Sequence, residues 1–414
     1  MKVLTVVTDL AKGGTQRVAQ IFANSFEELG AESKILCVNA LGPRVDELND
    51  QVVALEQLNE VNLALVSQWN PDVVHIHSTG LTKNDLEPLW PNLSAECSVI
   101  DTNVFSEPTP WEEHVDHSLQ LGSWAEWLYL LRGGKREKSI ILPNPVDVDS
   151  FNPATIQEVE EFRRVHNIPP EAKLIGRIGQ SSPAKWSLML IDVFDELSRK
   201  SKDLYLLLVN PPDNILERAR TSSFSQNIIH IDRIIGDKAL SVAYSAMDIF
   251  THIAERGESF GLVLTESILC ETPVVTLQTP WGDNCQGEVL GHLKGGLVVH
   301  SKEGFKKAIQ ALLTNKLDVN LEKEGRNHVI NKFDRIKLSR QILSLHPKQD
   351  QIKPVKGQRL MSLLNDSYDK PTLLTRVFLS FNNDTLRRLT IYTTGYKPIR
   401  QIFKSVASRI QFLF

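Results

Sequence analysis

MKVLTVVTDLAKGGTQRVAQIFANSFEELGAESKILCVN, residues 1–39, decides the fold class. Residues 3–8 are short and rich in β-branched side chains, as expected of a buried parallel strand. After a Gly-Gly turn, apolar side chains recur at helical spacing over residues 15–30, and a second strand-like run covers residues 32–39. This order predicts a βαβ unit, in which a helix connects two parallel strands.

The same alternation continues along the chain, is interrupted by prolines between residues 145 and 170, and then restarts. The sequence therefore predicts an α/β protein with two consecutive doubly wound domains. The predicted domains are residues 1–160 and residues 161–346, the second ending in a helix over about residues 320–345. The remaining predicted strands lie at residues 72–77, 98–102, 139–142, 173–176, 204–209, 228–231, 248–252, 273–277 and 296–299.

The formal charge of −4 conceals two regions of opposite sign. Residues 351–414 carry 11 basic and 3 acidic side chains, a net +8, whereas the rest of the chain carries 35 and 47, a net −12. We expect the tail, residues 347–414, to be mostly helical or partly flexible. Its basic and apolar residues suit an anionic membrane surface, and the alternative is a helix docked on the acidic body. No aromatic and basic pattern predicts nucleic-acid binding.

Composition excludes several other classes of protein. The hydrophobic fraction of 42% and the charged fraction of 23% are ordinary for a globular chain. The four cysteines form no C-x-x-C pair and no histidines cluster at metal-ligand spacing, so we expect reduced thiols and no structural zinc. The N-terminus lacks the features of a signal peptide, and no window offers about 20 apolar residues. We expect a cytoplasmic protein, at most peripheral at the inner face of a membrane.

One stretch, ESFGLVLTESILCETPVV at residues 258–275, carries two carboxylates eight positions apart. Glu258 precedes a Phe260-Gly261 turn that opens a predicted helix, and we place Glu266 about two turns into it. The free N–H groups of such a helix start suit a phosphate or a hydroxylated ligand. Two carboxylates placed in this way could accept hydrogen bonds from two rings of one extended ligand. The alternative is that Glu258 caps the helix and Glu266 is solvated.

Two further segments place candidate groups at strand ends. In GRIGQSSPAKWS, residues 176–187, Arg177 and Lys185 flank a loop where two cations could neutralise a diphosphate leaving group. The alternative is that both are ordinary surface residues. Gly13 and Gly14 follow the first strand and would let backbone amides approach a ligand, although a plain turn is the alternative.

Taken together, these segments resemble the retaining glycosyltransferase family 4, the glycosyl transferases group 1, whose fold is GT-B. The family signature is Glu-x7-Glu followed by small-Gly-Thr-Pro-Val-Val, which here ends as CETPVV at residues 270–275, with Glu271 at the usual Gly. The segment from Gly176 resembles the family's Gly-Arg…Lys donor loop, with a longer spacing between the cations. The resemblance covers residues 1 to about 345.

This resemblance implies two Rossmann-like domains facing across a cleft that holds a nucleotide-diphosphate sugar. The first domain would lie on the acceptor side, and the acceptor would be a hydroxyl of a glycan or a lipid-linked molecule. No metal ion or other cofactor is implied. Arg177 and Lys185 would stabilise the departing diphosphate and Glu258 would orient the sugar. We expect Arg177→Ala to lower turnover strongly while the fold persists. The implied donor-binding residues are Gly13, Gly14, Phe260, Gly261, Leu262 and Glu266, with Glu266 at the ribose.

Some positions depart from the family pattern or allow another interpretation. Phe105 stands at or near a position where the family often has His, which leaves the acceptor side open. We interpret Asp147 and Asp149, a D-x-D by spelling, as part of a turn and helix cap rather than a metal site. His75 and His77 are more often structural in such a place. The alternative functions are a nucleotide-sugar epimerase or hydrolase on this fold, or a non-catalytic nucleotide-sugar-binding protein.

Overall fold

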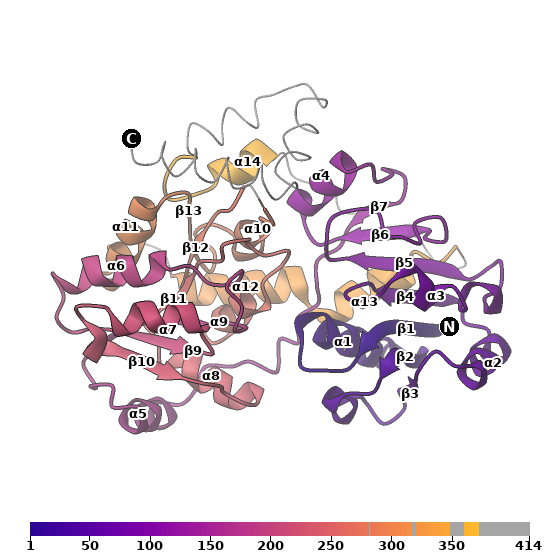
Figure 1. Cartoon of the computed structure of the whole chain (residues 1–414), viewed down its shortest axis with the longest axis horizontal. Coiled ribbons are helices and arrows are strands. Elements are labelled where there is room, and N and C mark those ends of the chain that lie inside the picture. Colours follow the sequence, from indigo (N-terminus) through magenta and orange to yellow (C-terminus); the bar gives the residue numbers. More distant parts are fainter. Residues whose placement is uncertain (281, 317–319, 348–359, 372–414) are drawn as a thin grey trace.

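The computed structural model describes residues 1–280, 282–316, 320–347 and 360–371. These residues form two parallel sheets, of seven and six strands, in two domains that lie side by side (Figure 1). The strand orders are β3-β2-β1-β4-β5-β6-β7 and β10-β9-β8-β11-β12-β13. In both sheets the order reverses beside the first strand, which is the doubly wound arrangement, and the predicted fold class is therefore confirmed.

The first domain contains the first sheet and the helices that cover it (Figure 1). Its strands are β1 (Lys2–Asp9), β2 (Glu32–Ala40), β3 (Val53–Glu56), β4 (Val73–His77), β5 (Ser98–Asn103), β6 (His117–Gln120) and β7 (Ser139–Ile141). Its helices are α1 (Gly14–Glu28), α2 (Glu60–Trp69), α3 (Lys83–Leu86) and α4 (Ser123–Leu131).

The second domain repeats the alternation. Its strands are β8 (Lys173–Ile178), β9 (Leu204–Val209), β10 (Ile228–Ile231), β11 (Ile249–His252), β12 (Val274–Leu277) and β13 (Gly296–Val299). The helices after the crossing are α5 (Ile156–Val165), α6 (Met189–Ser198), α7 (Asp213–Arg220), α8 (Asp237–Ser245), α9 (Leu262–Leu269), α10 (Gln286–Leu290), α11 (Lys302–Leu313), α12 (Leu321–Phe333), α13 (Arg335–Leu343) and α14 (Leu360–Asn365).

Three local features differ from the sequence prediction, each for a physical reason. Strand β3 has only four residues, and β6 buries the polar Ser118 and Gln120, so the hydrophobic pattern misses both. The single helix predicted near the end of the second domain is wrong. Asp334 ends α12, and its carboxylate accepts a hydrogen bond from the Lys337 N–H (2.8 Å), which caps α13 instead.

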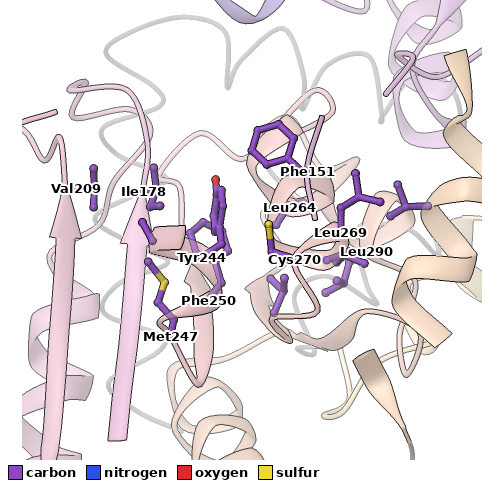
Figure 2. Packing of buried hydrophobic residues seen from close by; sticks show 14 of the residues in the cluster. Phe151, Ile178, Val209, Tyr244, Met247, Phe250, Leu264, Leu269, Cys270 and Leu290 are labelled. Carbon is purple, nitrogen blue, oxygen red and sulfur yellow. The ribbon is translucent and has the colours of Figure 1, made fainter. Parts of the chain in front are cut away.

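The core of the second domain lies beneath the carboxyl ends of its strands. Tyr244 and Phe250 pack edge-on, with ring centroids 5.4 Å apart. Figure 2 shows them near Ile178 and Val209, the last residues of β8 and β9. Phe151, from the segment that joins the domains, packs edge-on against Tyr244 at 6.4 Å. The crossing segment is therefore anchored in the core that supports the strand ends.

Elements near the crossing are shared between the domains. Helix α5, which a boundary at residue 160 divides, packs on α8 of the second domain. Helix α13 packs on α1 of the first domain, where Leu338 and Ile342 join the cluster around Val18 and Phe22. The last helix before the tail thus returns to the first domain.

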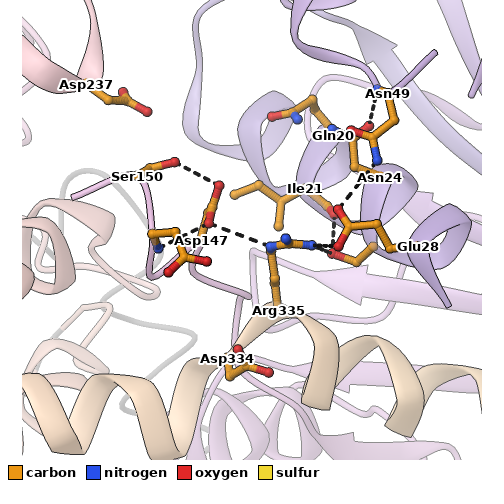
Figure 3. A network of polar contacts seen from close by, with 12 residues as sticks. Gln20, Ile21, Asn24, Glu28, Asn49, Asp147, Ser150, Asp237, Asp334 and Arg335 are labelled. Carbon is orange, nitrogen blue, oxygen red and sulfur yellow. Dashed lines mark hydrogen bonds and ion pairs between the residues drawn. The ribbon is translucent and has the colours of Figure 1, made fainter. Parts of the chain in front are cut away.

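A polar network fixes this junction (Figure 3). Arg335 donates to Glu28 Oε2 of α1 at 2.7 Å, and its Nε lies 3.6 Å from Asp147 Oδ1. The Ser150 hydroxyl donates to Asp147 Oδ2 at 2.8 Å. Asp147 therefore lies in a turn, as predicted, but the predicted helix cap is wrong, because α5 is capped by Thr155.

The described part of the tail, residues 360–371, packs on the body and touches both domains. Leu364 is buried with Trp124 and Leu128 of α4. Asp369 accepts hydrogen bonds at 2.6 Å from the backbone N–H of His300 and from the Ser301 hydroxyl at the start of α11. Docking on the body is therefore observed for this part. Most of the segment proposed for a membrane surface, residues 351–359 and 372–414, lies outside the described residues.

Candidate functional site

The two predicted carboxylates lie on either side of the start of helix α9. Gly261 is its N-cap residue and has a φ of +93°, a left-handed conformation that favours glycine. Glu258 precedes this turn and is 8% exposed. Glu266 lies only just over one turn into the helix, not two as predicted, and its Oε2 accepts a hydrogen bond from the Tyr244 hydroxyl (2.9 Å).

Glu258 forms a charged group with the predicted Lys185. Lys185 Nζ lies 2.5 Å from Glu258 Oε2, although the two residues come from loops after different strands. His252 ends β11 and places its Nε2 3.5 Å from the other carboxylate oxygen. Burial alone would raise the pKa of Glu258, but His252 and Lys185 outweigh it and lower that pKa to about 2. The carboxylate is therefore ionised and suited to accepting hydrogen bonds.

Arg177, the other predicted cation, is buried and does not face an open site. Strand β8 includes it, and the side chain is 1% exposed. Its guanidinium donates to the carbonyl oxygens of Ile178 (3.0 Å) and Lys185 (2.8 Å) and packs over the rings of Trp186 and Phe250. Burial lowers the pKa of Arg177 to about 10. Its observed contacts hold the loop that carries Lys185, and its role at a diphosphate stays a prediction.

The starts of α1 and α9 face each other where the two domains meet. A Cβ atom on Gly14 would lie 3.9 Å from Leu262 Cδ1, so the structure brings these two predicted residues together. Gly13 is the N-cap of α1 and has an extended backbone. Phe260 is different, because its ring is buried edge-on against Phe333 at 5.3 Å and leaves only its backbone for a ligand.

Sequence reasoning missed the residues that connect the first domain to Glu266. Arg17, in the first turns of α1, forms a two-point hydrogen bond with Asp237 of α8, and its Nη1 lies 3.8 Å from Glu266 Oε1. Burial raises the pKa of Glu266, and Arg17 is the main group that opposes this rise. The only signal in the sequence was the position of Arg17 shortly after the two glycines.

Two departures from the family pattern have clear structural settings. Phe105 is 51% exposed in the turn after β5, where Arg132 Nη1 donates to the carbonyl oxygens of Phe105 (2.7 Å) and Ser106 (3.1 Å). Glu271 has a φ of +59°, a left-handed conformation that explains why glycine is usual there. Phe105 is therefore a fixed and exposed group on the first domain.

Solved structures show the same architecture. A glycosyltransferase from Rickettsia africae superposes with a TM-score of 0.69 and 17% identity, over 83% of this chain and 97% of that one. Anabaena Alr3699/HepE, solved in complex with UDP-glucose, gives a TM-score of 0.65 and 15% identity, over 83% of this chain and 99% of that one. Two doubly wound domains arranged in this way define the GT-B fold.

The sequence comparisons add the family. Residues 158–328 match the family model of the glycosyl transferases group 1. D-inositol 3-phosphate glycosyltransferase from Corynebacterium jeikeium is 30% identical over 148 residues, which are 34% of this chain and 35% of that relative. The alignment thus spans about a third of that relative's length. The second domain thus matches the glycosyl transferases group 1 family, as the resemblance of its motifs predicted.

Proposed function

We propose that the chain is a retaining glycosyltransferase of family 4, which moves a sugar from a nucleotide-diphosphate sugar to an acceptor hydroxyl. The observation that carries this proposal is the set formed by Lys185, Glu258 and Glu266, a cation and two carboxylates held around the start of α9. Such a set matches the three parts of the donor, with Lys185 for the diphosphate, Glu258 for the sugar and Glu266 for the ribose.

The charges suit the bond that breaks. When the bond between the sugar and the diphosphate breaks, negative charge grows on the departing diphosphate. The Lys185 side chain is 31% exposed and can reach such a group, and the α9 N-terminus adds a positive dipole end. We propose that these groups supply the positive charge without a metal ion.

The state of Glu258 favours retention of configuration. A carboxylate whose pKa is lowered to about 2 is a weak base, and Lys185 and His252 already engage it. We therefore assign it to holding sugar hydroxyls rather than to removing a proton from the acceptor. In this mechanism the acceptor hydroxyl attacks the face that the diphosphate leaves, and the diphosphate itself receives the proton.

Two comparisons guide the choice of ligands. A structural neighbour is solved with UDP-glucose, so uridine-diphosphate sugars are the first donors to test. A relative is named for D-inositol 3-phosphate, a phosphorylated polyol, which supports a hydroxylated acceptor. We propose a glycan or a lipid-linked acceptor. None of the helices in the described ranges is long and apolar enough to cross a bilayer, and we propose that any membrane contact is peripheral.

The test is a panel of nucleotide sugars screened for thermal stabilisation, followed by product analysis with candidate acceptors. We expect one donor class to raise the melting temperature and its sugar to be transferred with the anomeric configuration retained, as read by NMR. Glu258→Gln should keep nucleotide binding and lose transfer. Free sugar or an epimer formed without an acceptor would favour the hydrolase or epimerase alternative. Donor binding with no turnover for any acceptor would favour the binding-protein alternative.

A further inference from the structure

Arg17 reaches from the first domain to the second. It lies in the first turn of α1, three residues after Gly14, and its Nη1 and Nη2 donate to Asp237 Oδ1 (3.1 Å) and Oδ2 (2.7 Å). A paired geometry of this kind fixes the plane of the guanidinium as well as its position. Asp237 is the first residue of α8, after Gly236 with a φ of +90°. The two domains therefore share a directional contact between α1 and α8.

The guanidinium is also packed into place. Its side chain is 14% exposed, and its central carbon lies 5.2 Å from the ring centroid of Phe151, in the crossing segment. Arginine side chains on a surface normally keep their freedom and contribute little. Burial, ring contact and a two-point hydrogen bond together show that Arg17 is fixed in the contact between the domains.

Arg17 lies beside the free oxygen of the Glu266 carboxylate. Glu266 Oε2 is engaged by the Tyr244 hydroxyl, and its Oε1 faces Arg17 Nη1 at 3.8 Å, slightly too far for a hydrogen bond. A ligand hydroxyl that binds Oε1 would therefore lie beside the guanidinium. In the proposed function, that hydroxyl belongs to the ribose of the donor.

We propose that Arg17 is a positioning residue for the nucleotide half of the donor. Held by Asp237, it fixes the Glu266 carboxylate for the ribose hydroxyls and couples nucleotide binding to contact between the two domains. This inference rests on the proposed function and extends the first domain's expected part in donor binding from the Gly13-Gly14 turn to the ribose end of the nucleotide. The pKa directions agree with it, because Arg17 opposes the rise that burial imposes on Glu266.

The test measures binding of uridine diphosphate by calorimetry and steady-state kinetics with the donor found in the screen. Arg17→Ala should weaken uridine diphosphate binding about tenfold and raise the KM for the donor by a similar factor, while kcat changes less than threefold. Arg17→Lys should recover little of this loss, because an ammonium group cannot donate to both Asp237 oxygens in the same plane. Asp237→Asn should show a smaller loss in the same direction.

A matched control is available at the other end of α1. Arg335 also joins α13 to α1, through Glu28 at 2.7 Å, but it lies at the junction of Figure 3. Arg335→Ala should lower the melting temperature and leave uridine diphosphate binding unchanged. A double-mutant cycle between Arg17→Ala and Glu266→Gln should show effects that are not additive.

The outcomes separate this inference from the proposed function. A wild-type chain that binds no nucleoside diphosphate overturns both. If the wild type binds uridine diphosphate and Arg17→Ala binds it equally well, the role of Arg17 is overturned and the proposed function stands. An equal loss in Arg17→Ala and Arg335→Ala would show general loosening of the domains and would also overturn it, as would additivity in the cycle.

Discussion

The two domains bury a histidine at the end of corresponding strands and use it differently. His77 ends β4, which lies next to β1, and His252 ends β11, which lies next to β8. Burial lowers the pKa of His77 to about 3 and that of His252 to about 4, so both rings are neutral near pH 7. His252 faces Glu258, whereas His77 packs against the rings of His75 and Phe22. The same place in the fold is a packing position in one domain and part of a polar site in the other.

Two buried carboxylates show the same contrast. Asp101 on β5 is fully buried, and burial together with nearby Glu112 raises its pKa to about 8. Glu258 is almost as buried, but Lys185 and His252 lower its pKa to about 2. Burial is similar in the two cases, so the neighbouring groups decide the charge state. The repeated sheet supplies positions, and the loops that follow its strands supply the chemistry.

The largest expected effect is on Lys185, the cation that distinguishes Glu258 from Asp101. Lys185→Ala should lower kcat about 100- to 1,000-fold, because it removes a positive charge from the departing diphosphate. Lys173→Ala is the control, since Lys173 stands at the opposite end of β8 from the cleft. Initial rates with the identified donor measure both variants. Turnover of Lys185→Ala within threefold of the wild type would contradict the role of this cation.

Arg177→Met should show the second-largest effect, and on two properties together. The variant loses the hydrogen bonds to the Ile178 and Lys185 carbonyl groups, and it leaves those acceptors buried. We expect the free energy of unfolding to fall by about 2–4 kcal/mol, with turnover falling as the Lys185 loop loosens. This adds a loss of stability to the sequence-based expectation that removing the Arg177 guanidinium lowers turnover strongly while the fold persists. Urea unfolding tests it, and an unchanged midpoint with reduced turnover would return Arg177 to a role at the donor alone.

Much of the fold follows from the sequence because it is local. β-branched runs predict the long strands, and helical periodicity predicts the helices. Strand β6 is not predicted, because its buried Ser118 and Gln120 resemble loop residues. The break between α12 and α13 at Asp334 is not predicted either, because the apolar spacing continues through it. Local patterns are thus reliable where apolar residues decide the element and fail where polar ones do.

The site is predicted only in part, for the same reason. Glu258, Glu266 and Lys185 lie in recognisable segments, and the structure places them around one helix start. The contact between Arg17 and Asp237 joins residues 220 positions apart, and no pattern in either segment predicts it. His252 reads as an ordinary strand residue until its neighbour Glu258 is placed in space. Contacts between domains depend on the packing of whole elements, which no short pattern encodes.

The effect expected from Asp101 is confined to stability, without a change in turnover, and it depends on pH. Its pKa of about 8 in the folded chain exceeds the ordinary value of 3.8, so between these values the folded state holds a proton that the unfolded state lacks. Its contribution to stability is therefore present at low pH and is lost as pH rises, by about 1.4 kcal/mol per pH unit.

Asp101→Asn stays neutral throughout and removes this dependence. The difference in unfolding free energy, variant minus wild type, should grow between pH 5 and pH 8, because contributions of the histidines are common to both chains and cancel. Denaturant titrations at three pH values measure this difference. A constant difference would show that Asp101 is ionised in the folded chain, as Glu258 is.

The smallest effects are expected from two threonines, one in each domain, that each contact a buried histidine. Replacing them compares the histidines of the two domains directly. Thr102 Oγ1 lies 2.8 Å from His75 Nε2 in the first domain, and Thr276 Oγ1 lies 2.9 Å from His252 Nδ1 in the second. Each Thr→Val change removes one buried hydrogen bond and should cost about 1 kcal/mol of stability.

Only the change in the second domain should affect catalysis. Without the Thr276 hydroxyl, the ring of His252 loses the contact that orients it toward Glu258, and we expect Thr276→Val to lower kcat about fivefold. Thr102→Val should leave kcat unchanged, because His75 faces no charged group of the site. Paired measurements of melting temperature and initial rate distinguish the two. Equal kinetic losses would mean that the buried histidines of both domains act only through stability, and the contrast between the strand ends would then disappear.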